Sequence, residues 1–350
     1  MATPRRLHRK SGAPDLKNLS ALFSIAYLTI VPLAQAQDVQ TFEVKSRLIE
    51  NFAIGSDQAQ FGPLQFVGGL EMVGASSDFG AISGIELAED QSKFIAVADT
   101  GFWIQGEISR DENNRPTGLE NVSMREITGE SGAPISAKWQ ADAEGIVADG
   151  QNIIVSFERA HRIANYTQQR DKQPVFENEY SPPVPPYELR NNRGFEGIAN
   201  APAVTPLDGA LVGISERSLD KNKNIMGFVQ KTIGDSFEFS VRRKDEFDIT
   251  DLAFLPNGNL IILERRFNVS DGIGMRLRHI RAGDVKEGAT VDGETLLLAD
   301  FLYQIDNMEG LTITIDDDGI PRLTLVSDDN HSLLQRNLLL EFRLTGALAN

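Results

Sequence analysis

A short cassette recurs five times in this 350-residue chain, and it limits the possible folds more than any other feature. Each copy has two apolar runs joined by a turn, and most copies carry an acidic residue at both ends. Alternating apolar residues on either side of a turn indicate a β-hairpin. The five hairpins are expected at residues 83–100, 142–159, 195–217, 249–265 and 307–330.

The spacing of the cassettes predicts a ring of similar sheets. Their second positions are Gly84, Gly145, Gly197, Asp251 and Gly310. A separation of roughly 50 to 60 residues is typical of four-stranded propeller blades with loops of unequal length. Five cassettes therefore predict an all-β propeller of five blades, with six as the alternative if the N-terminal strands build their own blade. Strand-like residues 41–53 and 64–73 are expected to pair with residues 338–344, which would close the ring and remove its open edges.

The first 36 residues have the layout of a secretory signal peptide. A basic leader precedes a mostly apolar run at residues 19–33, and Ala34-Gln35-Ala36 has the small-x-small pattern of a cleavage site. The apolar run is short for the ~20 residues of a membrane-spanning helix, which disfavours an uncleaved anchor. The sequence predicts a signal peptide at residues 1–36, one domain at residues 37–350, and a periplasmic or secreted location.

The charge and the rare residue types exclude several classes of function. The chain has 34 basic and 50 acidic residues, a net charge of −16. Such a balance repels nucleic acid and anionic lipid, so we expect neither as a partner and no stable membrane insertion after signal cleavage. The absence of cysteine excludes disulfides and a thiol nucleophile. Outside the leader only His161, His279 and His331 remain, which is few for a zinc site built on imidazole.

Hairpin geometry predicts that the acidic residues gather at one mouth of the ring. The two strands are antiparallel, so the start of the first lies beside the end of the second. Calcium binds six to eight carboxylate or amide oxygens and tolerates irregular geometry, which makes it the preferred ion. The predicted metal ligands are Glu144, Glu158, Glu196, Glu216, Glu264, Glu309 and Asp328, and the same mouth is expected to hold Asp99, Asp251 and Asn330.

Three closing acids are followed directly by arginine, namely Arg159, Arg217 and Arg265. Two interpretations stay open. The arginines would pair with carboxylates of the adjacent blade and form a belt of salt bridges without metal. Alternatively, they would bind phosphate or carboxylate oxygens of a substrate, for which the planar guanidinium is suited.

A catalytic role is expected of two glutamates and one histidine. A bound ion can activate water or polarise a substrate oxygen. Glu144 or Glu196 would then act as general base, provided that its pKa is raised. His161 lies three residues after Glu158 and would transfer a proton, although a lone histidine near a strand end is more often an ordinary polar residue. No nucleophile elbow, phosphate loop or dinucleotide fingerprint is present.

Several of these motifs together resemble the phytase-like domain, a family described as having the esterase-like activity of phytase. The motifs are Ser83-Gly84-Ile85, Asp142-Ala143-Glu144-Gly145, Gly194-Phe195-Glu196-Gly197, Leu263-Glu264-Arg265, Asp306-Asn307-Met308-Glu309-Gly310 and Ser327-Asp328-Asp329-Asn330. The resemblance spans about residues 68–344 and implies an exported β-propeller. Similarity to calcium-dependent propeller phytases adds calcium and phosphomonoester cleavage. This chain departs from the pattern at Asp251, which replaces glycine, and at Ile85-Glu86, so these two units are expected to contribute ligands differently.

The sequence therefore predicts an exported, calcium-dependent hydrolase that acts on a small anionic or ester substrate, either a phosphoester or a related ester. Two alternatives stay open. One is a non-catalytic propeller whose ring binds an ion for stability and whose loops bind a partner. The other is a lactonase-like hydrolase, because calcium at a propeller mouth also supports that chemistry.

Overall fold

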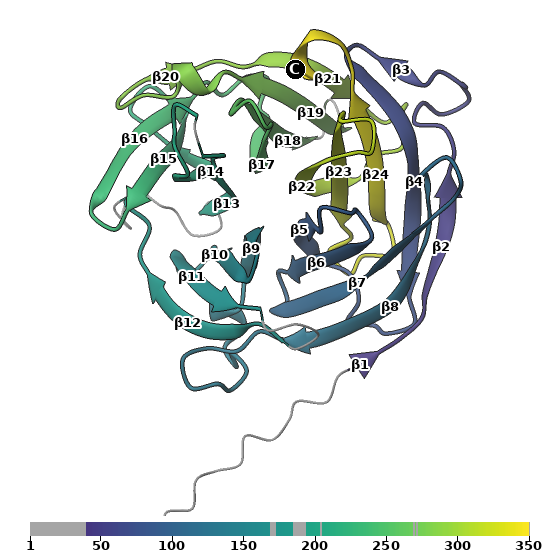
Figure 1. Ribbon diagram of the computed structural model, residues 1–350, viewed down its shortest axis with the longest axis horizontal. Helices are drawn as coiled ribbons and strands as arrows, with labels where there is room; N and C mark the ends of the chain where they lie inside the picture. The colour runs from purple at the N-terminus through teal and green to yellow at the C-terminus, as the bar shows by residue number, and fades with distance from the viewer. Residues whose placement is uncertain are drawn as a thin grey trace, which may run out of the picture. The chain divides into compact units, whose positions relative to one another are not determined.

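Five β-sheets stand in a ring around a central axis, and each sheet is one propeller blade (Figure 1). The computed structural model describes residues 40–168, 173–184, 194–203, 205–268, 270 and 272–349. The predicted all-β propeller is confirmed with five blades. The predicted signal peptide lies outside the described residues and stays a prediction. Within the described part of the chain, no helix is long and apolar enough to cross a membrane.

The first three blades follow one another along the chain. Blade 1 contains β5 (Ile82–Leu87), β6 (Lys93–Ala98), β7 (Phe102–Arg110) and β8 (Pro116–Glu126), with β1 (Gln40–Thr41) at its outer edge. Blade 2 contains β9 (Ala143–Asp149), β10 (Asn152–Phe157), β11 (Arg162–Thr167) and β12 (Val175–Tyr180). Blade 3 contains β13 (Phe195–Asn200), β14 (Leu211–Leu219), β15 (Ile225–Thr232) and β16 (Asp235–Val241), with β20 (Thr290–Val291) parallel to β16.

Blade 4 is built from consecutive parts of the chain, whereas blade 5 is completed by strands from both ends of the described chain. Blade 4 contains β17 (Asp248–Phe254), β18 (Leu260–Asn268), β19 (Gly272–Ile280) and β21 (Glu294–Ala299). Blade 5 contains β22 (Asn307–Ile315), β23 (Pro321–Asp328), β24 (Asn337–Leu344), β4 (Leu64–Gly74) and β2 (Val44–Ile49), and β3 (Gln60–Phe61) pairs with β4. The antiparallel pairing of β24 with β4 confirms the predicted ring closure. Among the described residues, the short 3-10 helices η1 (Lys138–Gln140) and η2 (Ala282–Asp284) lie in connections, and η3 (Gly346–Ala349) follows the last strand.

The tight turns of the inner hairpins depend on glycine. Asn257-Gly258 joins β17 to β18, and Asp318-Gly319 joins β22 to β23. Gly258 has φ +85° and Gly319 has φ +77°. This left-handed backbone is strained for residues with a Cβ, which explains why Asn-Gly and Asp-Gly stand between the paired strands.

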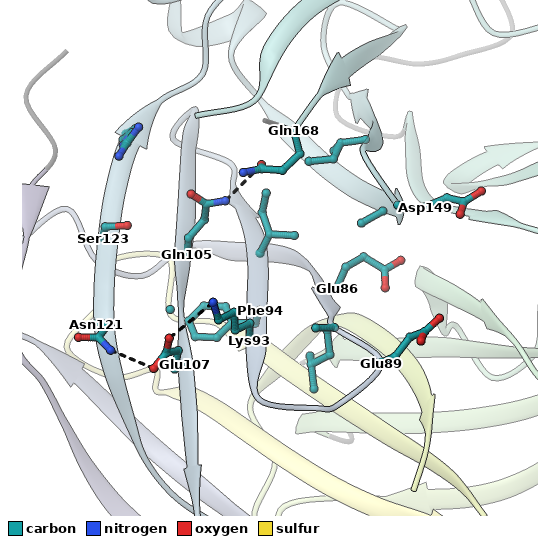
Figure 2. A pocket seen from close by; sticks show the side chains of 18 residues that line it. Glu86, Glu89, Lys93, Phe94, Gln105, Glu107, Asn121, Ser123, Asp149 and Gln168 are labelled. Atoms are coloured by element: carbon teal, nitrogen blue, oxygen red, sulfur yellow. Dashed lines mark hydrogen bonds and ion pairs between the residues drawn. The ribbon is translucent and has the colours of Figure 1, made fainter. Parts of the chain in front are cut away.

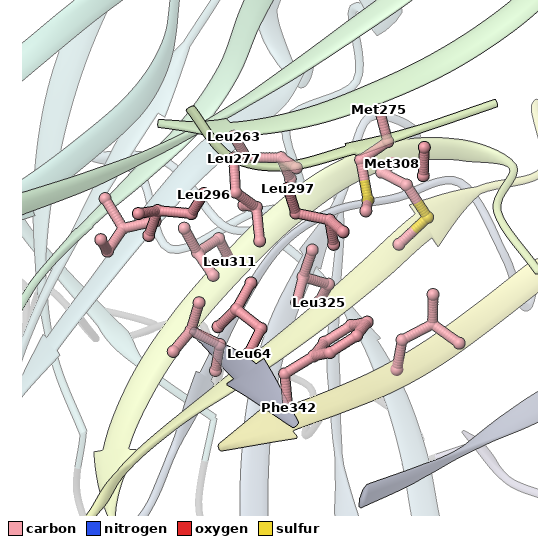
Figure 3. Packing of buried hydrophobic residues seen from close by; sticks show 14 of the residues in the cluster. Leu64, Leu263, Met275, Leu277, Leu296, Leu297, Met308, Leu311, Leu325 and Phe342 are labelled. Carbon is pink, nitrogen blue, oxygen red and sulfur yellow. The ribbon is translucent and has the colours of Figure 1, made fainter. Parts of the chain in front are cut away.

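The blades are held together by apolar side chains packed between neighbouring sheets. The described residues form five buried clusters, and each cluster joins a different pair of adjacent blades. In the cluster between blades 4 and 5, Leu263 and Leu277 of blade 4 lie near Leu311, Leu325 and Phe342 of blade 5 (Figure 3). Because each sheet buries both faces, its strands are apolar on both sides, and packing of this kind is the main stabilising term of the fold.

At the axis the five inner strands share one irregularity. In every inner hairpin the register shifts by one residue, so that the inner strand has one residue more than its partner between two flanking pairs; in blade 2, Glu144 and Gly145 lie opposite the single Ser156. These bulge residues are Ser83, Glu144, Glu196, Thr250 and Glu309. A β-bulge redirects side chains and is frequent beside functional sites. The bulges therefore decide which side chains lie close to the axis of the ring.

The residue after each bulge lies against the next blade. A Cβ built on Gly84 would lie 2.7 Å from the Glu144 carbonyl oxygen, and one built on Gly197 would lie 2.8 Å from the Asp251 Cα. Gly310 approaches the Gly84 Cα in the same way and completes the ring. Glycine is required here because the inner strands approach one another backbone to backbone.

We predict that Gly145→Ala destabilises the protein by about 1–3 kcal/mol, because the added methyl group clashes with the Glu196 carbonyl oxygen and lies 2.9 Å from the Ser156 Oγ. Urea unfolding measures the change. Gly118→Ala is the matched control, since no atom lies within 4 Å of its Cβ position, and its change should stay within about 0.5 kcal/mol. Equal stability of the two variants would contradict the close approach at the axis.

Candidate functional site

Three of the five bulge residues are glutamates that converge on the axis. Glu144, Glu196 and Glu309 come from blades 2, 3 and 5. Burial raises the pKa of Glu144 and of Glu196 well above the ordinary value, and the other carboxylates of the group raise both further. Burial also raises the pKa of Glu309 to about 8, although Arg265 opposes this shift. The bulges thus bring three carboxyl groups together in a largely buried space, where the uncharged form is favoured.

A second ring of side chains follows from the strand pairing. Phe157, Ser215, Glu264 and Ser327 each pair with the residue just before the bulge of their own hairpin. The next residue along the chain is an acid in three of these blades and Arg265 in blade 4. The full second ring is Asp99, Glu158, Glu216, Arg265 and Asp328. Arg265 therefore occupies the place that an acid has in the other blades.

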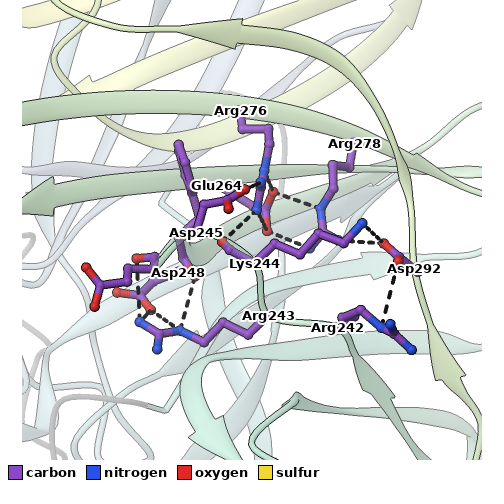
Figure 4. A network of polar contacts seen from close by, with 11 residues as sticks. Arg242, Arg243, Lys244, Asp245, Asp248, Glu264, Arg276, Arg278 and Asp292 are labelled. Atoms are coloured by element: carbon purple, nitrogen blue, oxygen red, sulfur yellow. Dashed lines mark hydrogen bonds and ion pairs between the residues drawn. The ribbon is translucent and has the colours of Figure 1, made fainter. Parts of the chain in front are cut away.

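The prediction that Glu264 lies with the mouth acids is wrong. Successive side chains of a strand point to opposite faces, so a register difference of one residue turns Glu264 away from the mouth. Its carboxylate is fully buried between Arg276 and Arg278, at 2.5 Å from the Arg276 Nε and 2.6 Å from the Arg278 Nη2 (Figure 4). Arg276 also contacts Asp245 at 3.0 Å. Glu264 is thus a structural ion-pair partner within blade 4.

The arginines after the closing acids form part of the predicted salt-bridge belt. Arg265 bridges its two neighbouring blades, because it contacts Glu216 of blade 3 at 3.1 Å and also pairs with Glu309 of blade 5. Arg217 of blade 3 pairs with Asp248 of blade 4. Arg159 differs, since its partner Asp142, at 2.7 Å, belongs to the same blade. Among the described residues, these arginines therefore pair with Glu216, Asp248, Glu309 and Asp142. Within the same part of the chain, they form no ion pair with Glu144, Glu158 or Glu196.

The acids of blades 2 and 3 form two groups that meet at Glu158. Asp142, Glu144 and Glu158 make one group, and Glu158, Glu196 and Glu216 make the other. In each group the three carboxylate oxygens lie within 4.8 Å of one another. Calcium–oxygen bonds of about 2.4 Å place two ligands of one ion at most about 4.8 Å apart, so both groups fit a calcium ion.

The pKa values of these acids agree with a site that lacks enough positive charge. Burial raises the pKa of Glu158 to about 7, although the Gly194 N–H donates to its carboxylate at 3.2 Å. Burial raises the pKa of Asp142 to about 6 despite the adjacent Arg159. Carboxylates in this state gain stability from a cation that replaces the proton.

Besides Glu264, two predicted ligands lie outside both groups, namely Glu309 and Asp328. Glu309 accepts hydrogen bonds from Arg265 and from the Asn307 Nδ2, the latter at 2.7 Å. Asp328 accepts the Asn330 N–H at 2.6 Å, and burial raises its pKa to about 7. These contacts hold Glu309 and Asp328 on the side of blade 5, whereas the groups that fit an ion belong to blades 2 and 3.

His161 lies beside Glu158, as its position in the sequence suggests. Its backbone N–H donates to the Glu158 carbonyl at 2.9 Å, and it has the left-handed φ of +42°. Both ring nitrogens are buried, and neither has a hydrogen-bond partner among the described residues. Burial lowers the pKa of the imidazole, which favours the neutral form that can accept a proton.

Two further acids serve other purposes. Asp251 replaces the glycine of the fourth unit, and its carboxylate accepts the Leu311 N–H of blade 5 at 2.6 Å and the Leu252 N–H at 2.8 Å. It therefore joins blades 4 and 5. Glu86 lies farther along its inner strand and accepts a hydrogen bond from the Thr312 Oγ1 at 2.7 Å. The first and fourth units therefore depart from the common pattern, as expected. The spacing of residues in the sequence did not reveal the hydrogen bonds of Glu86 and Asp251 that explain these departures.

Glu86 also lines a cavity of 670 Å³ between blades 1 and 2 (Figure 2). Gln105 of β7 donates to Gln168 across this cavity at 3.3 Å, and Asp149 lies at its edge. Asp149 is the last residue of β9, which places the cavity away from the mouth where β9 begins. None of the predicted catalytic, substrate-binding or metal-binding residues line it.

A larger cleft of 810 Å³ opens at the acidic mouth over blades 4 and 5. Arg217, Arg265 and Glu216 line its inner end. Two of the three predicted substrate-binding arginines therefore face a cavity of ligand size, which typically measures about 300–1,000 Å³. Arg159 is not part of this cleft and has a side-chain exposure of 42 % next to Asp142.

The family model Phytase-like, described as esterase-like activity of phytase, matches residues 77–331. The chain belongs to this family. The match contains all five inner hairpins, so the family pattern coincides with the ring of bulges and closing residues described above. No curated protein matches the chain.

The chain also has a distant likeness to solved structures. The Myxococcus xanthus glutaminyl cyclase structure is 11 % identical, with a TM-score of 0.43, over 81 % of this chain and 97 % of that one. The structure of U3-55K is 10 % identical, with a TM-score of 0.39, over 80 % of this chain and 98 % of that one. Likeness at this level carries no information about the reaction.

We predict that calcium stabilises the protein in a pH-dependent manner. The raised pKa values of Asp142, Glu158, Asp328 and Glu309 mean that the folded chain keeps protons which the unfolded chain loses. Without metal, stability is therefore greatest near pH 4 and falls as the pH rises through about 6 to 8. Calcium bound by the acids of blades 2 and 3 competes with the protons of Asp142 and Glu158, so its effect should grow as the pH rises through about 6 to 7. At a hundredfold excess over its Kd it should raise the melting temperature by about 5 °C at pH 8.

At pH 5 the same calcium concentration should change the melting temperature by less than about 1 °C, because protons then occupy the carboxylates. Asp149→Asn is a suitable control, since Asp149 is an exposed acid at the far end of β9. It should retain the full effect at pH 8. Equal shifts at pH 5 and pH 8 would contradict a site made of these acids.

Proposed function

We propose that this protein is an exported, calcium-dependent hydrolase that cleaves a phosphoester or a related ester at the acidic mouth of its propeller. The observation that supports this most is the pair of carboxylate groups that share Glu158. They lie beside a cleft lined by arginines and within a family whose description refers to esterase-like activity. Export is proposed from the signal-peptide pattern of residues 1–36.

The donor set of the mouth fits calcium. Asp142, Glu144 and Glu158 would hold the ion through oxygen atoms only, and the chain offers no thiolate. Oxygen ligands in irregular geometry suit calcium, whereas zinc sites generally use nitrogen or sulfur. When bound, such an ion supplies Lewis acidity to a phosphoryl or carbonyl oxygen.

Residues of the chain itself would act as general base, accept the proton and orient the substrate. Glu196 is the proposed general base, because it is 5 % exposed and because burial and the neighbouring carboxylates raise its pKa, which strengthens its ionised form as a proton acceptor. The neutral imidazole of His161 accepts the proton and releases it to solvent. Arg217 and Arg265 face the cleft with part of each guanidinium exposed, and they orient an anionic oxygen of the substrate.

A second function is favoured by the ion pairs of Arg265 with Glu216 and Glu309. Since they join blades 3, 4 and 5, the same ring would stabilise a non-catalytic propeller that binds a partner through its loops. Both functions predict calcium binding, and only turnover separates them. Lactone hydrolysis remains a third outcome at the same site.

We predict calcium-dependent turnover that requires Glu196 and Glu158. Hydrolysis should be measured on p-nitrophenyl phosphate, p-nitrophenyl acetate and a δ-lactone, with calcium or with EDTA. Glu196→Gln should lower kcat by roughly 100-fold or more, because it removes the base and keeps the shape. Glu158→Gln should raise the calcium concentration for half-maximal activity by about tenfold or more, because it removes a charged ligand.

Asp149→Asn serves as the control and should match the unmodified protein. Equal rates with calcium and EDTA, or an unchanged kcat in Glu196→Gln, would contradict the proposed reaction. A calcium-dependent melting shift without turnover of any substrate would support the binding propeller instead.

A further inference from the structure

The cleft at the mouth has a charged inner end and an apolar outer rim. Its inner end contains Arg217, Arg265 and Glu216. Its outer part is lined by Phe267 from the end of β18 and by Leu334 from the loop between β23 and β24. The two ends belong to one continuous cavity, so a single ligand can contact both.

The apolar rim is unusually exposed. Phe267 is 85 % exposed and Leu334 is 93 % exposed, while the adjacent Leu333 is fully exposed. Isolated exposed apolar residues are common on protein surfaces. Here, however, residues from two different blades line the same cavity, and Ile273, which pairs with Phe267 between β18 and β19, lines it as well. A concentration of apolar surface within a ligand-sized cleft indicates a binding surface.

The cleft has no surplus of positive charge. Among the described residues that line it, three arginines are balanced by three acids: Arg217, Arg265, Arg266, Glu216, Asp248 and Asp306.

Each of these arginines already has a partner. Arg217 pairs with Asp248, Arg265 bridges two carboxylates, and Arg266 lies over the ring of Phe247 at 4.8 Å. Across the axis lie further acids, so the local field opposes a ligand of high negative charge. A divalent cation bound at Glu158 would balance the negative charge of one anionic group of the ligand.

We propose that the substrate is a small soluble amphiphile, in which one anionic ester group is joined to an apolar group, and not a polyphosphorylated polyol. This inference rests on the proposed function for the position of the ester. The anionic group lies at the arginines beside the acid groups of blades 2 and 3, and the apolar group lies against Phe267 and Leu334. A ligand with many phosphates would meet an electrically balanced cleft and would leave the apolar rim in contact with water.

Binding of non-hydrolysable phosphonates tests the inference separately from catalysis. Methyl-, butyl- and octylphosphonate would be titrated calorimetrically into the calcium-loaded protein below the concentration at which octylphosphonate forms micelles. Burial of methylene groups strengthens binding by up to about fourfold each, so octylphosphonate should bind roughly 100-fold more tightly than methylphosphonate. Inositol hexakisphosphate should bind more weakly than octylphosphonate.

The double variant Phe267→Ala with Leu334→Ala should lose most of this dependence on chain length and should bind methylphosphonate as before. Ile233→Ala is the matched control, because Ile233 is 79 % exposed in the turn between β15 and β16, away from the cleft. It should keep the full dependence.

Binding that does not change with chain length, or tighter binding of inositol hexakisphosphate, would overturn the inference. Binding to phosphatidylglycerol vesicles without binding of monomeric octylphosphonate would also overturn it and would indicate a lipid surface as the partner. A protein that binds octylphosphonate tightly but hydrolyses no ester would support the amphiphile site and would contradict the catalytic proposal, so the two failures are distinguishable.

Discussion

The close approach of five inner strands at the axis is the constraint on which the rest of the structure depends. Gly84, Gly145, Gly197 and Gly310 lie against the backbone of a neighbouring blade, and a larger side chain would force the ring apart. The residue before each of these positions is a β-bulge that lies close to the axis of the ring. Packing at the axis and presentation of the carboxylates are therefore two consequences of one local backbone geometry.

One basic residue in place of an acidic one makes the second ring of side chains asymmetric. Arg265 stands where the other blades have Asp99, Glu158, Glu216 and Asp328, and it neutralises the acids nearest to it. The acids of blades 2 and 3 then remain close together with too few cations, and burial keeps their pKa values high. Arg265 therefore leaves the mouth with two different sides. The side of blades 2 and 3 carries acids that fit a metal ion, and the side of the cleft carries both arginines and acids, where the anionic end of a substrate would bind.

Much of the fold was predictable because it rests on local signals. Alternation of apolar residues, turn glycines and the spacing of the cassettes predicted five hairpins, and the strand-like ends predicted closure through β4 and β24. The site was less predictable. A bulge adds one residue to one strand, and sequence alone does not show where that residue falls. This is why Glu264 was expected at the mouth although Arg265 occupies that place.

The other departures also depend on contacts between blades. Asp251 accepts an N–H from blade 5, and Arg265 binds carboxylates 49 and 44 positions away. No local pattern specifies such pairs. By contrast, antiparallel pairing alone brings the two ends of a hairpin to the same edge, which predicts that Glu158 lies near Glu144. The structure places Glu158 with Glu144 in one group and with Glu196 of the next blade in the other.

The most direct test of the account is an anomalous-diffraction experiment on crystals of the protein grown with calcium and soaked with manganese, which also binds oxygen ligands. The account predicts a peak of anomalous density bonded to the Glu158 carboxylate and to carboxylates of Glu144 or Glu196. Absence of a peak at saturating metal, or a peak bonded to Glu309 and Asp328 in place of Glu158, would contradict it.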